Sequence, residues 1–300
     1  MYENIKQTFA DKYSEFFSVR VKIKKDYKMY KIGGSKMNAY LYVIFLGVSF
    51  CASVVGAICG IGGGVLIKPL LDAFGVLSVA SISFLSGCTV LSMSCYSVVK
   101  AKKSGDSLVD MKTGTPLAIG AALGGVVGKM MFQFLSELSS NKERVGAIQG
   151  ICLLIITFGT MVYTLKKDKI KTHYVQNVLA CILIGVALGI CSSFLGIGGG
   201  PINLVVLFFF FSMDTKTAAQ NSLYIILFSQ ITSLINTIVT KTVPEFTAGL
   251  LILMVAGGIL GGMVGRKINK RIDGETVNKL FIGLMAIIML ICAYNIYRLW

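Results

Sequence analysis

The chain has 300 residues, 55% of them hydrophobic and only 14% charged, and its mean hydropathy is +0.76. Since soluble domains are about 25% charged, this composition excludes a soluble protein. The net charge of +15 does not indicate nucleic acid, because the basic residues lie between apolar runs and ahead of the first one, as the positive-inside effect predicts. We therefore expect an all-α polytopic integral membrane protein, with the lipid bilayer as a partner and no nucleic acid.

Residues 1–36 form a polar N-terminal arm with nine Lys and Arg, interleaved with aromatic residues. It is much longer than the basic region of a signal peptide. One interpretation is a basic amphipathic arm that lies on an anionic membrane surface. The other, which we prefer slightly, is a solvated tail that fixes orientation. In both cases we expect a cytoplasmic N-terminus in the plasma (inner) membrane.

Eight apolar runs follow, and most match the roughly 20 residues that cross a bilayer as a helix. The first and fifth are too long for one crossing, and each contains the sequence GIGGG. Glycine destabilises a continuous helix, so we expect a break at each motif followed by a shorter half-helix. Gly60, Pro69, Gly196 and Pro201 are expected to form the breaks. The runs are 37–67, 73–99, 113–128, 145–165, 172–213, 217–240, 246–265 and 280–297.

An internal repeat relates the two halves. The motif Gly60–Gly64 matches Gly196–Gly200 at an offset of 136, and Gly120–Lys129 matches Gly257–Arg266 at an offset of 137 with six of ten positions identical. We expect about eight transmembrane helices in two four-helix repeats. The predicted domains are an arm, a first repeat, a cytoplasmic linker and a second repeat: 1–36, 37–165, 166–177 and 178–300.

The sidedness of the loops depends on whether each GIGGG element crosses once. Single crossings from a cytoplasmic N-terminus place 19 basic residues inside and 8 outside, with the basic loop 266–279 outside as the exception. A return of the second element to its own side would improve the balance to 23 against 4. Single crossings are preferred, because two matching motifs are expected to fold alike.

The two motifs also carry a family resemblance. GIGGGVLIKPLL, and its second copy in which Val205 replaces the proline, resemble the paired glycine motifs of the TauE/SafE sulfite-exporter family of membrane transporters over about residues 40–300. The resemblance implies transport of small anions, often sulfur oxyanions or organosulfonates such as sulfite. The TSL element that follows each motif in the family is degenerate here, at Ser83–Leu85 and Asn221–Leu223. The basic arm lies outside the pattern.

The expected site is an anion site made of helix ends. A break frees backbone N–H groups, and the N-terminus of a half-helix carries about half a positive charge. The glycines are predicted to contact the substrate; they are Gly62, Gly63, Gly64, Gly198, Gly199 and Gly200. Polar side chains are predicted to complete the pocket or, alternatively, to bond between helices; they are Ser83, Ser86, Asn203, Gln220, Asn221 and Ser222.

Three cations lie close to the membrane. Lys68 either attracts the anion or reaches the surface with Asp72 as its partner. Lys129 and Arg266 hold matching positions at helix ends, where we expect interfacial anchoring. Small residues spaced four apart predict close helix contacts around Gly124 and Gly261, either between the repeats or between protomers of a homo-oligomer.

The leading function is therefore a secondary transporter of small anions, expected to be an exporter. The alternatives are an anion channel or a non-transporting membrane partner subunit. An enzyme is not expected, because no Asp or Glu lies deep within an apolar run to act as a base, and the lone histidine, His173, belongs to a basic loop. The eight cysteines lie in apolar runs and are expected to pack as small hydrophobes, and no metal or cofactor is expected.

Overall fold

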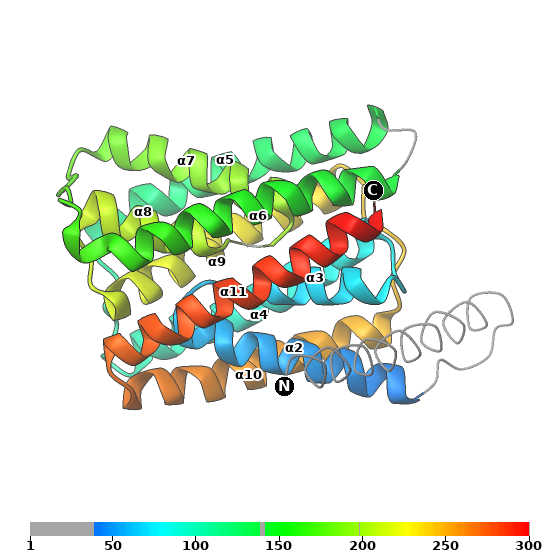
Figure 1. Ribbon diagram of the computed structural model, residues 1–300, viewed down its shortest axis with the longest axis horizontal. Helices are drawn as coiled ribbons and strands as arrows, with labels where there is room; N and C mark the ends of the chain where they lie inside the picture. Colours follow the sequence, from blue (N-terminus) through cyan, green and yellow to red (C-terminus); the bar gives the residue numbers. More distant parts are fainter. Residues whose placement is uncertain (1–38, 139–141, 198, 300) are drawn as a thin grey trace, which may run out of the picture.

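The computed structural model describes residues 39–138, 142–197 and 199–299, and the regular elements of this part are helices (Figure 1). The arm 1–36 and Gly198 lie outside the described residues. The elements are α2 (Ala39–Cys59), α3 (Gly64–Phe74), α4 (Val79–Lys103), α5 (Met111–Leu138), α6 (Lys142–Lys166), the short 3-10 helix η1 (Lys167–Lys169), α7 (Val178–Leu195), α8 (Pro201–Phe211), α9 (Thr215–Val239), α10 (Ala248–Arg271) and α11 (Gly274–Leu299).

Within the described residues, eight helices are long and apolar enough to cross a membrane, which confirms the predicted number. The other two, α3 and α8, have 11 residues each. As helices they span only about 16 Å, roughly half of the hydrocarbon core. They are the shorter pieces predicted after each glycine motif.

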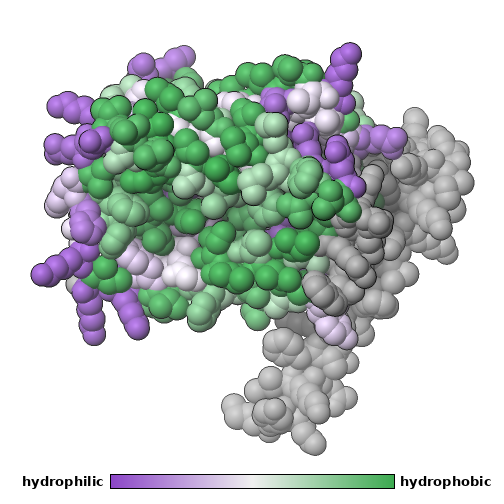
Figure 2. Space-filling view, turned by 90° about the horizontal axis from the view of Figure 1, so that it is seen from above, coloured by the Kyte–Doolittle hydropathy of each residue, from purple (hydrophilic) through white to green (hydrophobic). Residues whose placement is uncertain are grey.

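An apolar belt surrounds the middle of the helix bundle. Figure 2 shows hydrophobic side chains along the middle of the face and hydrophilic ones at the two ends. Exposed members of the belt include Leu123, Phe158 and Ile252, on three different helices. Water would penalise such a surface and lipid does not. The belt therefore shows that the long helices run along the membrane normal.

The loops at one end of the bundle contact one another. Asp106, between α4 and α5, pairs with Arg266 of α10, and Lys167 after α6 reaches Thr215 and Asn278 at the starts of α9 and α11. We call this the basic end, and the other the opposite end. These contacts contradict single crossings, which placed 100–112 and 166–171 on one side and 214–216 and 266–279 on the other.

The sidedness prediction fails because each half-helix turns back. After α2 has crossed from the opposite end, α3 returns toward it, and Ser81 at the start of α4 donates a hydrogen bond to the Glu245 carbonyl there. Likewise α8 returns to the basic end where α7 began, and Ser212 just beyond it donates a hydrogen bond to the His173 carbonyl. The two motifs do fold alike, but both return instead of crossing.

The described α-helices fall into two sets of five, α2–α6 and α7–α11, which follow the same order of long and short helices. A helix of one set packs against a helix of the other. Helix α5 packs along α7, while α10, at the matching place, packs along α2. The glycines predicted to mediate close contacts lie at these two interfaces: Gly124 against the Val186 backbone, and Gly261 against Phe50 and Ser53. The small-residue faces therefore join the two halves of one chain.

Candidate functional site

The first break lies between α2 and α3. Gly60 and Gly62 have φ of 75° and 72°, a conformation that only glycine adopts readily, and Gly63 caps α3. The Gly60 N–H still bonds to the Gly56 carbonyl, which closes the last turn of α2. The chain reverses here because two left-handed residues interrupt the helix, as predicted for Gly60.

The second break lies between α7 and α8. Gly196 ends α7 with φ of 65°, and Gly199 has φ of 122°. Pro201 is the first residue of α8, where a missing N–H costs nothing. Gly200 precedes it as the N-cap. Gly196 and Pro201 therefore form the break as predicted.

Pro69 does not take part in a break. It lies inside α3, and its carbonyl accepts a hydrogen bond of 2.8 Å from the Asn295 Nδ2 of α11. The expectation that Pro69 ends a helix was wrong, because the chain has already reversed at Gly60–Gly63. Pro69 is the sixth residue of α3, and the side chain of Asn295 lies beside its carbonyl group.

The N-termini of the two half-helices meet in the interior. Gly64, the first residue of α3, is so close to the Ile197 carbonyl that a side chain would clash with it. A Cβ on Gly200 would lie 3.5 Å from Val65 Cγ2. Since a helix N-terminus carries a partial positive charge, two such ends raise the positive potential at this place. The predicted glycines that are described, Gly62 to Gly64 with Gly199 and Gly200, thus form one cluster.

Several predicted polar residues border this cluster. A Cβ on Gly196 would lie 2.7 Å from Ser83 Oγ, and one on Gly64 would lie 3.0 Å from Ser86 Oγ. Asn203 is 1% exposed and lies beside Gly199. The hydroxyls of Ser83 and Ser86 and the Asn203 Oδ1 have no hydrogen-bond partner within the described residues, and neither has the buried Ser222 hydroxyl. Buried polar atoms usually have partners, so these groups are available to a ligand.

Gln220 and Asn221 instead bind the α4–α5 loop. The Asn221 Oδ1 accepts from the Asp110 N–H, and its Nδ2 donates to the Leu108 and Thr217 carbonyls. Gln220 accepts from the Leu108 N–H. Their amides attach this loop to the start of α9, so of the two alternatives weighed for them, the contacts favour bonding between segments.

Lys68 forms a buried ion pair with Asp72, one turn further along α3. The Lys68 Nζ lies 3.0 Å from Asp72 Oδ2, and the side chains are 5% and 9% exposed. Lys68 therefore does not reach the surface. A Cβ on Gly196 would lie 3.4 Å from Lys68 Cε, so the lysine stem borders the second break. The sequence pointed to Asp72 as the partner of Lys68 but placed the pair at the surface. Its burial was missed, because Asp72 lies between two apolar runs.

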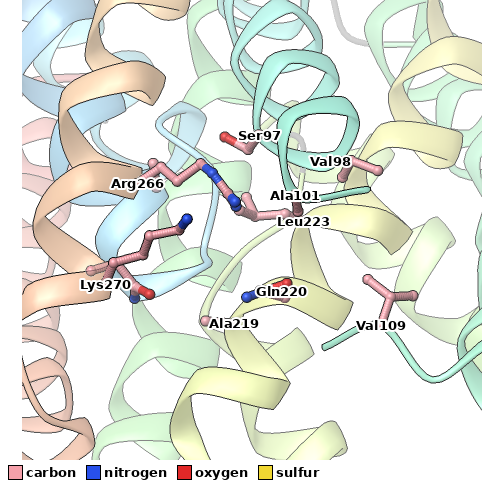
Figure 3. A pocket seen from close by; sticks show the side chains of 11 residues that line it. Ser97, Val98, Ala101, Val109, Ala219, Gln220, Leu223, Arg266 and Lys270 are labelled. Carbon is pink, nitrogen blue, oxygen red and sulfur yellow. The ribbon is translucent and has the colours of Figure 1, made fainter. Parts of the chain in front are cut away.

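A pocket opens at the basic end (Figure 3). Arg266 and Lys270 extend into it from α10, toward α4 and the start of α9. Both pair with Asp106. Partial burial raises the pKa of the Asp106 carboxyl, but the hydrogen bonds and charges of Lys270 and Arg266 outweigh that effect and hold the pKa below its usual range.

A second pocket lies toward the opposite end. Lys129 of α5 lines it, together with Ser83, Gln149, Ser193 and Gly196. Arg266 and Lys129 hold matching sequence positions, and each lines a pocket beside a glycine break. Interfacial anchoring therefore does not describe where these two cations lie. In the sequence, the signal for these equivalent places was the alignment of Lys129 with Arg266 in the matched blocks Gly120–Lys129 and Gly257–Arg266.

The helices and the two breaks together define a class of protein, a polytopic membrane protein with a polar site built on broken helices in its interior. The sequence profile of the family described as Sulfite exporter TauE/SafE matches residues 45–291, and the chain belongs to that family. This confirms the resemblance inferred from the GIGGG motifs. The protein is thus a membrane transporter, in line with the expectation that it is not an enzyme.

A curated relative is consistent with this class. The chain is 24% identical over 263 residues to a Bacillus subtilis protein named Probable membrane transporter protein YunE. The similarity covers 79% of this chain and 91% of the relative. No solved structure matches the chain.

Proposed function

We propose that the chain is a secondary transporter, an exporter, of small anions, and that its substrates are sulfur oxyanions or organosulfonates such as sulfite. The observation that carries this proposal is the meeting of the α3 and α8 N-termini at Gly64 and Gly200. Two positive helix ends attract an anion without a charged side chain. The family description, which names sulfite export, supports the choice of anion.

The two sets of five helices act as inverted repeats in this proposal. Helix α2 starts at the opposite end and α7 at the basic end, so corresponding helices run in opposite directions (Figure 1). In many transporters, repeats inverted in this way rock around a shared site and open it to each side in turn. The exchanged contacts, α5 with α7 and α10 with α2, are the interfaces along which such a motion would occur.

The orientation in the plasma (inner) membrane is part of the proposal. Since the positive-inside bias is counted over short loops near span ends, we place the basic end in the cytoplasm. This orientation places the start of α2, at the opposite end, on the outer side of the membrane. It therefore disagrees with the predicted cytoplasmic N-terminus, which depends on the nine basic residues of 1–36. The loops and helix ends of the basic end contain Lys100, Lys102, Lys103, Lys112, Lys166, Lys167, Lys169, Lys171, Lys216, Arg266, Lys267, Lys270, Arg271 and Lys279, and those of the opposite end contain Lys142, Arg144, Lys241 and Arg298.

Flux in liposomes tests this function. Purified protein should move sulfite, thiosulfate or methanesulfonate with saturation and counterflow. Single-channel conductance steps would favour the alternative of an anion channel. No flux of any of the three anions would favour the alternative of a non-transporting partner subunit.

A glycine pair tests the site within the same assay. Gly199→Ala places a side chain at φ of 122° and against Ile226, so it should lower flux about tenfold or more, in keeping with about 1–3 kcal/mol of backbone strain. Gly105→Ala is the matched control, because Gly105 has φ of 70° in a surface loop with nothing near its Cβ position. Equal flux from both variants would contradict the assignment of the site to the breaks.

A further inference from the structure

We propose that the pocket around Lys129 is an oxyanion-binding site, with Lys129, Ser83 and Ser193 as its specificity-determining groups. The pocket lies between α4, α5, α6, α7 and α9 and reaches Gly196 at the second break. The inference rests on the proposed function and deepens it, since it names the side chains that recognise the anion on the opposite-end side of the breaks.

The first support is a set of buried polar atoms without partners. Ser83 and Ser193 are 8% and 5% exposed, and neither hydroxyl has a hydrogen-bond partner within the described residues. Gln149 is 2% exposed; its Nε2 donates to the Phe194 carbonyl, and its Oε1 lacks a partner. Leaving buried polar groups unpaired costs about 1–3 kcal/mol each. The two serine hydroxyls can donate to the oxygens of an anion, whereas the Gln149 Oε1, an acceptor, cannot be satisfied by one. The two unpaired hydroxyls in one pocket therefore indicate a ligand with acceptor oxygens.

The second support is the charge of the pocket. Lys129 lines it, and no Asp or Glu is among its described lining residues. The Lys129 Nζ lies over the ring of Phe132, another lining residue, 5.4 Å from the ring centre, and forms no ion pair among the described residues. An ionisable side chain within a membrane-spanning segment marks a substrate path more often than a structural contact. A single cation with two hydroxyl donors suits an anion whose charge is spread over several oxygens.

The third support is the contrast with the pocket at the basic end. There, Arg266 occupies the position that matches Lys129, but it shares the carboxylate of Asp106 with Lys270. The same cation position therefore lines a pocket beside each break, but of the two cations only Arg266 forms an ion pair with a carboxylate among the described residues. An incoming anion would have to compete with Asp106 for Arg266, whereas it would meet Lys129 without a competing ion pair.

The test titrates the full chain in lipid nanodiscs with sodium sulfite, sulfate and methanesulfonate by calorimetry at constant ionic strength. Lys129→Met keeps the length of the side chain and removes its charge. It should raise the Kd of the best-bound anion about tenfold to a hundredfold, the range expected for a hydrogen bond to a charged group. Lys129→Arg should retain binding. Lys241→Met, at an exposed lysine of the same end, is the matched control and should leave the Kd unchanged.

A double variant, Ser83→Ala with Ser193→Ala, separates binding from folding. Because neither hydroxyl has a partner, their loss should leave thermal unfolding of the anion-free protein unchanged or slightly improved, while it weakens anion binding. If Lys129→Met does not fold, the effect of the double serine variant on anion binding alone tests the inference.

An unchanged Kd in Lys129→Met overturns the inference. If only the serine variant folds, an unchanged Kd in that variant overturns it. The proposed function stands in that case if liposomes with the unaltered chain still move the anion. Neither binding nor flux of the three anions by the unaltered chain would overturn both.

Discussion

Arg266 of α10 donates a hydrogen bond to the carboxylate of Asp106, although the two residues are 160 positions apart. Lys270 pairs with the other carboxylate oxygen. The three side chains tie the α4–α5 loop to the last turns of α10 and so connect the two halves of the chain. Arg266 and Lys270 also line the pocket at the basic end.

Asp106→Asn should lower the free energy of unfolding by no more than about 1 kcal/mol, because the Asp106 side chain is 32% exposed and such pairs are screened. The pKa of this carboxyl is lower in the folded chain than its ordinary value of 3.8. Its contribution is therefore fully present above that value and is lost as the pH falls through the lower folded pKa. Thermal unfolding from pH 7 to pH 3 should show the variant and the original converging at the acid end. A difference that grows toward acid pH would contradict this.

Gly124→Leu should prevent stable folding. A Cβ at Gly124 would clash with the backbone of Val186, which cannot move without separating α5 from α7. Gly159→Leu is the matched control on α6, since nothing lies near its Cβ position and replacing a helical glycine there should be neutral or stabilising by about 1 kcal/mol. Size-exclusion profiles and melting temperatures in detergent measure both. A monodisperse Gly124→Leu with an unchanged melting temperature would contradict the close contact.

Lys68→Met should destabilise the chain by about 3–5 kcal/mol, because it leaves the Asp72 carboxylate buried without its cation. Lys68→Met combined with Asp72→Asn should recover most of that loss, since no buried charge remains. Melting temperatures of the two single variants and the double variant form a mutant cycle. Additive losses would show that the two side chains do not depend on each other.

Cysteine labelling decides the sidedness of the loops. In a background without the native cysteines, Lys171→Cys and Lys267→Cys should react with a membrane-impermeant maleimide from the same side, and Thr242→Cys from the other side. The reason is that Lys167 and the α10–α11 region meet at the basic end, while Thr242 accepts a hydrogen bond from Gln133 at the opposite end. Labelling of Lys171→Cys and Lys267→Cys from different sides would restore single crossings. The side that reacts in intact cells also tests the cytoplasmic placement of the basic end.

Features that depend only on residues adjacent in the sequence could be predicted from it. The spanning helices follow from apolar runs of sufficient length, and both breaks follow from glycines inside overlong runs. The return of α3 and α8 was not predicted, although the charge count favoured it for the second element, because an 11-residue half-helix that turns back has the same composition as one that continues across. Pro69 illustrates the same limit, since its place within α3 depends on where the chain had already reversed.

The sequence by itself determined a membrane protein with eight spanning helices and two glycine breaks, because apolar length and backbone freedom are local properties of the chain. The tertiary structure alone decided that the half-helix N-termini meet, that Asp72 is buried beside Lys68, and that Lys129 and Arg266 line pockets. Each of these depends on which helices pack together. Gly124 illustrates the physical reason: its missing side chain permits close approach, but the partner, α7, follows only from the overall packing.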